Sequence, residues 1–533
     1  MIDRKKGRLA SLWSSDDAER TPILERARRC ASLTKPWVLP PKDQSPDSKL
    51  PENYQSDGAR GVTNLIGKMV MALFPPEEPW FNLVLDPEIK HDPQIPAELV
   101  EEAEQRLFIR EVIIQSVLES AGVQGMKRPS RRSGFRSGKL TSLTQLIVTG
   151  DTLEQLTDDY RLRVYRMDQY VTRRDSCGDV LHHGIKETID PLSLGEEVCE
   201  KAGLKPAELR KKTVSDRMID LFTFTEWQPE TMKWVVTQEL NGITINTSEE
   251  TISQFFATAA ELSPGEHYGR GFVEQNYGDL ASLDELEKRK LQFAELCSKF
   301  HPCVDIASEV RDEDLARPSG TVLRGVRVAD GQVKDIAFLK IDKYPDFRVV
   351  YETASEKRKS LNAAMLVESE VTPRGDRVTK YQASRVAREL EGALGGFYAP
   401  IADEQQQPLL RRVIHQLQKD KVIEILPEDT HRVVSLTGLA ALSREVKASR
   451  ITNFAAVASQ LGETAIAKID QRVLMDVLAR YENIAERGLV KTNQQIDAEQ
   501  QAAIAAQTQL AAAEKGVEVA GNVAEANLTA TTP

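Results

Sequence analysis

The sequence predicts an α+β protein that is mostly helical. Apolar residues recur every three or four positions over several long stretches, including 98–121 and 379–420, which is the spacing of one helix face. Between 161 and 245 the period shortens, and Gly178-Asp179 and Asn241-Gly242 are typical turn sequences, so strands are expected there. Hydrophobic residues make up 41% of the chain, which is enough for a packed core.

The longest helical pattern lies between Thr379 and Leu417. Thr379 and Gln382 have the spacing of a capping box, so a helix is expected to start here. Pro400 and Pro408 interrupt the pattern, and we expect kinks because proline lacks a backbone donor and clashes with the preceding turn. A helix of about 40 residues would span about 60 Å. Such a helix bridges regions or packs against copies of itself.

The charge and cysteine content exclude several classes of protein. The 533 residues carry a formal net charge of −11, which argues against a general nucleic-acid coating protein but not against a surface past which DNA slides. The five cysteines are scattered and odd in number, which indicates a reducing compartment without a disulfide framework. Neither a secretory signal nor an apolar run of 18 residues is present, so we expect assembly in the cytoplasm and no membrane span.

The first third of the chain reads as helices separated by loops. A helix is predicted around Ala18 to Leu33, followed by a proline-rich passage at 34–41 that suggests an extended arm lying on a neighbour. A helical stripe after Asp57 ends at Pro75 and Pro76, and a strand is predicted from Trp80 to Leu85. An apolar helix at Leu143–Val148 is predicted to end at Gly150.

A basic stretch precedes that last helix, and it has two readings. It contains no acidic residue and carries six cations: Lys127, Arg128, Arg131, Arg132, Arg136 and Lys139. Such a run can contact phosphates. Because Pro, Ser and Gly fill the spaces between the charges, we favour a flexible, solvated loop.

The middle of the chain predicts strands, then a pair of helices around a small insertion. Strands are predicted at 162–167, 221–227 and 234–237. A helix follows, with a possible capping box at Ser282 and Glu285, and it stops before Pro302. The returning helix at 349–366 has few apolar residues, so neighbouring subunits and a water-filled channel are expected to surround it.

Three stretches together resemble the portal, or head-to-tail connector, proteins of short-tailed, podovirus-type bacteriophages. The matching residues are Gly58-Ala59-Arg60-Gly61, Asn64-Leu65, Ala72-Leu73-Phe74-Pro75 and Trp80; Tyr268-Gly269-Arg270, Tyr277-Gly278-Asp279-Leu280 and Ser282-Leu283; and Arg377, Val378, Thr379, Leu390, Gly395, Gly396, Pro408 and Leu409. The matches keep their order across most of residues 54–420. The basic stretch departs from the family pattern, so no family role transfers to it.

The resemblance implies a division of the chain and a ring with a central channel. The implied regions are an N-terminal helix and arm (1–56), a wing (57–278), a first stem helix (279–300), a clip (301–347), a second stem helix (348–366), a channel loop (367–378), a long kinked wing helix (379–420), a crown (421–492), and an Ala/Gln-rich barrel helix or disordered tail (493–533). The implied ring contains twelve subunits and lies at one capsid vertex, the head–tail junction of the virion.

The implied function is mechanical. The ring would nucleate head assembly, pass double-stranded DNA inward under the drive of a separate terminase, and dock the tail for ejection. The expected partners are copies of the chain itself, double-stranded DNA, terminase, scaffolding and major capsid proteins, the tail adaptor or tubular tail protein, and internal core proteins. Arg374, Arg377 and Lys380 are the candidate contacts to DNA phosphates in the channel, although loop solvation or an inter-subunit ion pair would equally explain them.

Residues with catalytic or metal-binding potential do not form a recognised motif. Gly61 to Met69 resembles a phosphate-binding loop but has the wrong glycine spacing and no hydroxyl at Met69. Cys297, His301 and Cys303 lack a second ligand pair, so helix packing is the favoured use. His182-His183 is interpreted as surface, and the pairs Asp312/Asp314 and Glu287/Glu295 as solvated faces. We therefore expect no catalytic, cofactor-binding or metal site.

Two other classes remain to be distinguished from a ring subunit. A monomeric nucleic-acid-binding module would have a subunit-sized native mass and strongly salt-dependent binding. A phage DNA-processing enzyme, such as a nuclease or an ATPase, would show turnover that depends on a divalent metal.

Overall fold

The computed structural model describes residues 7–120 apart from 46, 76–78, 91 and 93, then 134–298, 302–338 with gaps, 344–367, 400–424, 430–435, and short stretches at 451–457, 460 and 474–475. The described part is an α+β structure in which helices predominate, as the sequence predicts. Two compact units are present, one formed by 1–95 and 113–439 and the other by 96–112 and 440–533. Only the first is described in enough detail to position a site.

Most of the longer helices fall in stretches where the sequence predicts helical periodicity. The longer helices are α1 (Arg8–Glu19), α2 (Thr21–Ser32), α3 (Asp57–Leu73), α5 (Ala97–Ser120), α6 (Phe135–Thr149), α11 (Tyr277–Ser298), α13 (Tyr344–Ala364) and α16 (Gln407–Lys419). A π-helix, η5 (Ile401–Gln406), runs directly into α16. The shorter helices are α4 (Pro87–Lys90), η2 (Met167–Gln169), η3 (Pro191–Leu194), α7 (Glu196–Lys201), α8 (Pro206–Leu209), α9 (Val214–Arg217), α10 (Phe272–Gln275) and α12 (Asp312–Leu315).

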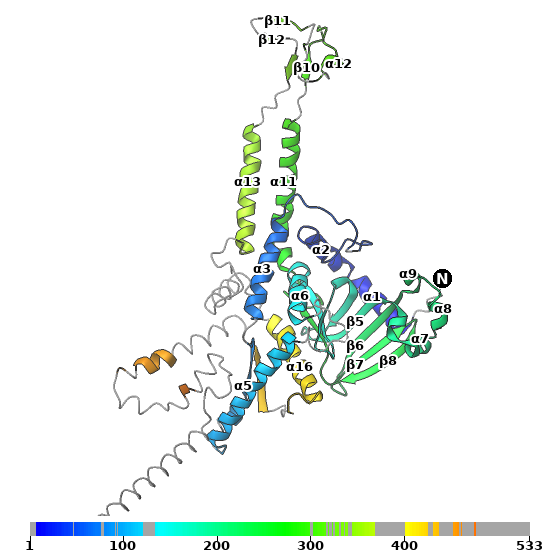
Figure 1. The fold of residues 1–533 in the computed structure, drawn as a ribbon, viewed down its shortest axis with the longest axis vertical. Helices are drawn as coiled ribbons and strands as arrows, with labels where there is room; N and C mark the ends of the chain where they lie inside the picture. Colours follow the sequence, from blue (N-terminus) through cyan, green and yellow to red (C-terminus); the bar gives the residue numbers. More distant parts are fainter. Residues whose placement is uncertain are drawn as a thin grey trace, which may run out of the picture. The chain divides into compact units, whose positions relative to one another are not determined.

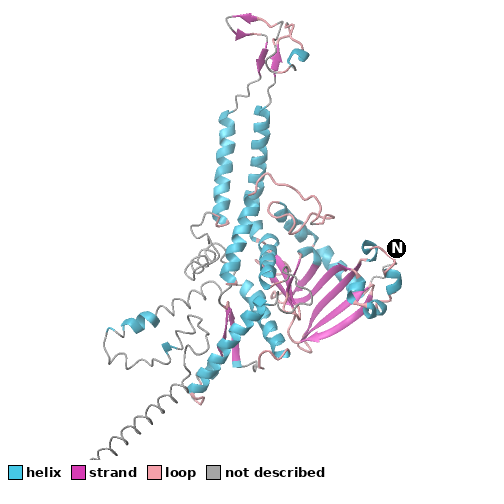
Figure 2. Cartoon of the chain, viewed as in Figure 1, coloured by secondary structure: helices cyan, strands magenta, loops and turns pink. Residues whose placement is uncertain are grey.

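An antiparallel sheet of five consecutive strands dominates the β structure (Figure 2). Its strands are β4 (Tyr170–Arg174), β5 (Val180–Ile189), β6 (Ile219–Gln228), β7 (Lys233–Leu240) and β8 (Ile243–Glu250). Asn241 and Gly242 join the last two strands, and both have positive φ (53° and 75°), as a tight hairpin turn requires. Helix α1 packs on this sheet, where the Glu239 carboxylate accepts a hydrogen bond from the Leu9 amide at 3.0 Å.

A second sheet of three strands, in the order β3-β2-β9, lies against α6. Its strands are β2 (Asp151–Leu156), β3 (Leu162–Tyr165) and β9 (Phe255–Ala259). The buried faces of α3 and α6 complete this core with Leu65, Met69, Leu143 and Ile147. Gly150 ends α6 with a φ of +88°, and a side chain here would collide with the backbone at Arg270 and Gly271, so only glycine fits.

Small two-stranded sheets account for the remaining strands. β1 (Phe81–Leu85) pairs with β14 (His431–Ser435), which joins segments about 350 residues apart. β10 (Pro302–Val304) pairs with β13 (Ile336–Phe338), and β11 (Val328–Ala329) pairs with β12 (Gln332–Val333).

The N-terminal region differs from the prediction. The sequence predicts one helix from Ala18 to Leu33, but the structure has two helices that meet at Arg20. Pro22 lies in the first turn of α2, where backbone amides have no partner within the helix, so its missing amide loses no hydrogen bond. Proline at this position therefore favours the start of a new helix. The proline-rich passage is not an extended arm within this chain, because it turns back and buries Val38 and Leu39 against its own chain.

Two further predictions about charged residues are wrong. Lys139 does not belong to a solvated loop, because α6 starts at Phe135 and buries Lys139 completely in an ion pair with Glu154 at 2.7 Å. His183 is not on the surface, since it is 2% exposed and stacks on Trp234, and burial lowers its pKa to about 3. The other residues of the basic stretch from Lys127 to Arg132 lie outside the described residues.

Candidate functional site at the base of the helical hairpin

Helices α11 and α13 lie side by side and form a long hairpin (Figure 1). The Phe293 and Phe347 rings stack with their centroids 4.4 Å apart. The Lys357 ammonium group donates to Asp279 at 2.6 Å on the opposite helix. Away from these contacts the hairpin leaves four large apolar side chains exposed: Leu291, Leu296, Val349 and Tyr351.

One face of α3 supports the C-terminal end of α13. Asp57, Gly61, Asn64 and Lys68 follow one another at intervals of four, three and four residues, so they lie on a single helix face. Gly61 lies under Met365, and a Cβ at Gly61 would lie only 2.0 Å from the Met365 sulfur. The absence of a side chain at Gly61 therefore allows α13 to approach α3 closely.

The side chains of Asn64 and Lys68 cap the C-terminal end of α13. The Asn64 amide donates to the carbonyl oxygens of Met365 and Leu366 at 3.2 and 2.9 Å, and the Lys68 ammonium group donates to Leu366 at 2.9 Å. The last carbonyls of a helix have no partner within the helix, and a cation there also interacts favourably with the helix dipole. Leu366 adopts a left-handed conformation (φ 53°), so the chain leaves the helix abruptly at this point.

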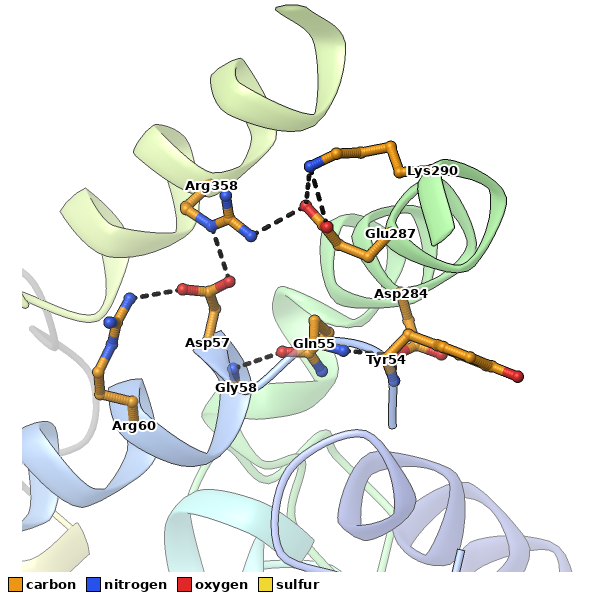
Figure 3. A network of polar contacts seen from close by, with 9 residues as sticks. All are labelled: Tyr54, Gln55, Asp57, Gly58, Arg60, Asp284, Glu287, Lys290 and Arg358. Carbon is orange, nitrogen blue, oxygen red and sulfur yellow. Dashed lines mark hydrogen bonds and ion pairs between the residues drawn. The ribbon is translucent and has the colours of Figure 1, made fainter. Parts of the chain in front are cut away.

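A network of charges joins α3, α11 and α13 (Figure 3). The Arg358 guanidinium donates through Nε to Asp57 and through Nη2 to Glu287, both at 2.9 Å. Lys290 donates to both oxygens of Glu287 at 3.0 Å. The carboxylates are largely buried, with side-chain exposures of 6% for Asp57 and 13% for Glu287. The hydrogen bond to Asp57 raises the pKa of Arg358, and the charges of Asp57 and Glu287 add to this against the opposing effect of burial.

The loop before α3 is held by the same helices. The Asp284 carboxylate on α11 accepts hydrogen bonds from the amides of Tyr54 and Gln55 at 2.8 and 3.1 Å. The Gln55 side chain in turn accepts from the Gly58 amide at 2.8 Å and so satisfies a free donor at the start of α3. We call this whole set of contacts, centred on Asp57, Glu287 and Arg358, the hairpin junction. It fixes the position of the chain immediately before residue 368.

The hairpin junction uses residues that the sequence assigns to other roles. Within Gly61 to Met69, the stretch that only superficially resembles a phosphate-binding loop, Asn64 and Lys68 bind the end of α13. Glu287 does not lie on a solvated face, since its side chain is only 13% exposed and binds both Lys290 and Arg358. The predicted capping box at Ser282 is absent, because α11 starts five residues earlier and Ser282 donates to Gly278 inside the helix. Arg374, Arg377 and Lys380 lie outside the described residues.

One sequence signal does identify the hairpin junction. Ala354 and Leu361 of α13 are buried, as is Met365 directly after the helix, and Arg358 falls in phase with these three at intervals of four, three and four. Glu287 is likewise in phase with the buried Leu280 and Leu283 of α11. A charged residue in the middle of a buried stripe needs a partner of opposite charge, and these two residues are each other's partners.

The hairpin junction has the chemistry of a structural tie. Within the part of the chain that the structure describes, three or more His, Cys, Asp or Glu side chains never come together as a group that could hold a metal ion. Cys297 and Cys303 are both exposed, so the predicted packing role of Cys297 is wrong, and His301 lies outside the described residues. In the described ranges no helix combines the length and the apolar character that a bilayer crossing needs.

These features define an α+β protein in which a sheet-bearing body anchors a helical hairpin. The family described as "Bacteriophage head to tail connecting protein" matches residues 6–489, so the chain belongs to this family. Its function is that of a head-to-tail connector, located at the head–tail junction of the phage virion.

Curated relatives confirm the resemblance to podovirus portal proteins. The chain is 28% identical to the portal protein of Escherichia phage T7 over 439 residues, covering 80% of this chain and 77% of that protein. It is 28% identical to the portal protein of Enterobacteria phage T3 over 487 residues (88% and 85%). It is 26% identical to the portal protein of Pseudomonas phage phiKMV over 506 residues (92% and 93%).

Solved structures with a partial likeness come from phage-type particles. One is an HK97-family phage portal protein from Corynebacterium diphtheriae, with a TM-score of 0.30 and 9% identity over 68% of this chain and 93% of that chain. Another is a chain in the neck of an empty GTA particle, with a TM-score of 0.29 and 12% identity over 70% of this chain and 87% of that chain.

Proposed function

We propose that the protein is one subunit of a ring, expected to contain twelve copies, at a single vertex of the phage capsid. The ring nucleates head assembly, forms the channel through which double-stranded DNA is packaged and ejected, and docks terminase first and the tail afterwards. The observation that carries this proposal is the family match over residues 6–489, nearly the whole of the chain.

Exposed apolar residues on the hairpin support assembly with sister subunits. Val349 is 62% exposed, Tyr351 58% and Leu291 57%, which is unusual for large apolar side chains on two neighbouring helices. Burying such side chains contributes about 25 cal/mol per Å² of apolar surface. Copies of the same helices arranged around an axis would cover them, because cyclic rings present the same pair of surfaces at every contact.

The regional assignments remain part of the proposal. The five-stranded and three-stranded sheets fall mainly in the proposed wing (57–278), and α11 and α13 overlap the proposed stem helices (279–300 and 348–366). The short strands β10 to β13 fall in the proposed clip (301–347). The hairpin junction then connects stem and wing next to the proposed channel loop (367–378).

The proposed channel acts on DNA through electrostatics alone. A chain of net charge −11 gives an acidic wall that repels the duplex. Arg374 and Arg377, with Lys380 next, contact phosphates transiently as the duplex passes. Phosphate contacts carry no sequence preference, which suits a conduit for a whole genome. The remaining proposed partners are scaffolding and major capsid proteins, the tail adaptor or tubular tail protein, and internal core proteins.

Native mass spectrometry of the purified full-length protein tests the ring. We expect a species of about twelve times the subunit mass of 59.5 kDa, together with annular particles in negative-stain images. A species of subunit mass that binds DNA in a strongly salt-dependent way would instead identify a monomeric nucleic-acid-binding module. Turnover that needs a divalent metal would identify an enzyme.

A further inference from the structure

The strand β2 is buried against α6 although most of its side chains are polar. Thr152 and Glu154 of this strand face α6, and both residues are completely buried. The Thr152 hydroxyl lies 3.3 Å from the Ser142 hydroxyl on α6, and the Glu154 carboxylate accepts from the Lys139 ammonium group at 2.7 Å. Buried polar groups are stable in a protein interior only when they are hydrogen-bonded, so every polar atom of this layer needs a partner.

Gln405 of η5 reaches into the same polar layer. Its amide nitrogen donates to the Ser142 hydroxyl and to the Glu154 carboxylate, both at 2.9 Å, and the residue is completely buried. An ionised carboxylate can only accept hydrogen bonds, so the contact with Glu154 fixes which end of the amide is the nitrogen. The amide oxygen, Oε1, has no hydrogen-bond donor in the part of the chain that the structure describes.

Thr258 contributes a second buried oxygen of this kind. It lies directly opposite Thr152 in the antiparallel pair of β9 and β2. Opposite residues of such a pair place their side chains on the same face, with Cβ atoms about 5 Å apart, so Thr258 also faces α6. The residue is completely buried, and its hydroxyl has no hydrogen-bond partner among the described residues.

Both oxygens lie next to one pair of hydroxyl groups. Thr258 neighbours Thr152, Gln405 binds Ser142, and the Thr152 and Ser142 hydroxyls are in contact with each other. The Gln405 oxygen can only accept, whereas each hydroxyl can both donate and accept. A water molecule matches this set, because it donates two hydrogen bonds and accepts others at the same time. Buried waters make about three hydrogen bonds to such groups.

The charges beside this layer favour a neutral ligand. The Lys139 ammonium group already neutralises Glu154, and it would repel a second cation. An anion would meet the Gln405 oxygen, which has no proton to donate. Moving any ion out of water into a completely buried site is also costly unless an opposite charge compensates it.

We propose that an internal water molecule is bound between Thr258 and Gln405, with the hydroxyls of Thr152 and Ser142 as its further partners. The water donates to the Gln405 oxygen and exchanges a hydrogen bond with the Thr258 hydroxyl. It thereby joins α6, β9 and η5, three elements that are distant in the sequence. This site does not depend on ring formation or on DNA, so it stands or fails separately from the proposed function.

An experimental density map of the full-length protein that resolves ordered waters tests the site directly. We expect a peak at hydrogen-bonding distance, about 2.7–3.2 Å, from both Thr258 Oγ1 and Gln405 Oε1. A direct hydrogen bond between these two side chains, the absence of a peak, or a peak with the coordination geometry of a metal ion would each overturn the proposal.

Thr258→Val gives a second test through the sign of its effect on the melting temperature. Valine keeps the shape of threonine and removes only the hydroxyl. If the hydroxyl binds water, its removal leaves the buried water with one partner fewer, and the melting temperature falls. If the hydroxyl has no partner, its removal relieves the folded state of an unsatisfied buried group, and the melting temperature rises.

Thr247→Val is the control, because Thr247 is an exposed residue of β8 and reports the effect of valine in a strand without a buried hydroxyl. A lower melting temperature for Thr258→Val than for this control supports the water site, and an equal or higher one contradicts it. Thr258→Ser keeps the hydroxyl, so we expect it to keep the density peak. If Thr258→Val does not fold, the map of the wild-type protein decides.

Discussion

At the scale of single residues, the body is unusual for the number of charged groups that it buries. Lys139 and Glu154 are both fully buried and face each other at 2.7 Å. Burial raises the pKa of Asp151 to about 7, against which the charge of Arg174 and the hydrogen bond from Tyr170 at 2.7 Å act in part. Such groups make the stability of the fold depend on pH in a way that surface charges do not.

Ionisation of the buried Asp151 carboxyl group destabilises the folded state, and this destabilisation grows between about pH 4 and pH 7. Asp151→Asn should remove it. The folded pKa of Asp151, about 7, lies above its ordinary value of 3.8, so the folded state holds the proton more tightly. The favourable contribution of protonated Asp151 to the free energy of unfolding is therefore fully present below pH 4 and is lost as the pH rises to 7. Asparagine keeps an acceptor for Tyr170 without the charge. We expect the melting temperature of the variant to exceed that of the wild type most clearly above pH 7.

Asp159→Asn is the control for this experiment, because Asp159 is 68% exposed and the substitution changes the net charge equally. Melting curves of the three proteins from pH 4 to pH 8 give the comparison. Parallel pH profiles for Asp151→Asn and the wild type would show that Asp151 is ionised in the folded protein.

The sequence could not predict these buried charges. Strand β2 reads Asp-Thr-Leu-Glu-Gln-Leu, which has none of the usual character of a buried strand, and it was not predicted. It is nevertheless buried, because its polar side chains find partners far away in the chain, including Tyr170 and Gln405. His183 was misjudged for the same reason, since Trp234 is remote in sequence. Local patterns do not contain such long-range partners.

At the scale of elements, the long helices were predictable because they bury one regular stripe. α3, α5, α11 and α13 all match the predicted ranges within a few residues, apart from the earlier starts of α11 and α13. Each hairpin helix includes a charged residue in its buried stripe, Glu287 in one and Arg358 in the other. The candidate site was thus visible in the spacing, but the third member, Asp57, is about 300 residues from Arg358 and could be added only by the structure.

Arg358→Met should loosen the hairpin at its base. The substitution keeps an unbranched side chain, shorter than that of arginine, but leaves Asp57 and Glu287, both largely buried, without their shared cation. We expect local opening of α13 to become easier by about 1–3 kcal/mol, measured by hydrogen exchange of residues 354–364. Adding Asp57→Asn should restore part of this loss, because the two residues interact directly.

Arg348→Met on the same helix is the control. Arg348 is 73% exposed and pairs with Glu352 four residues on, and exposed pairs of this kind contribute at most about 1 kcal/mol. Equal effects of the two substitutions on exchange would mean that the hairpin junction does not hold α13 in place.

At the scale of the whole molecule, the contacts proposed to hold the subunits together are apolar, whereas the forces proposed to act on DNA are electrostatic. The proposed ring contacts use apolar side chains such as Leu291 and Val349, whose attraction does not depend on salt. In the proposed channel, the net charge of −11 would act over a longer range and would keep a polyanion from adhering to the wall. The cations proposed on the channel loop would then dominate the contact with DNA. They would do so without affecting assembly.

Arg374→Ala combined with Arg377→Ala tests this separation. We expect rings of unchanged native mass, because the proposed ring contacts lie on the hairpin, but heads that package or retain less DNA. Lys211→Ala combined with Lys212→Ala removes the same charge from an exposed part of the proposed wing and is the matched control. The genome content of purified heads, measured by quantitative PCR with primers at both genome ends, gives the readout. Because phosphate contacts are screened by salt, higher ionic strength should weaken them in wild-type heads, and the deficit of the first variant should narrow. Heads of the first variant that fill and keep their DNA as well as the control would show that these arginines serve the loop itself and do not contact the duplex.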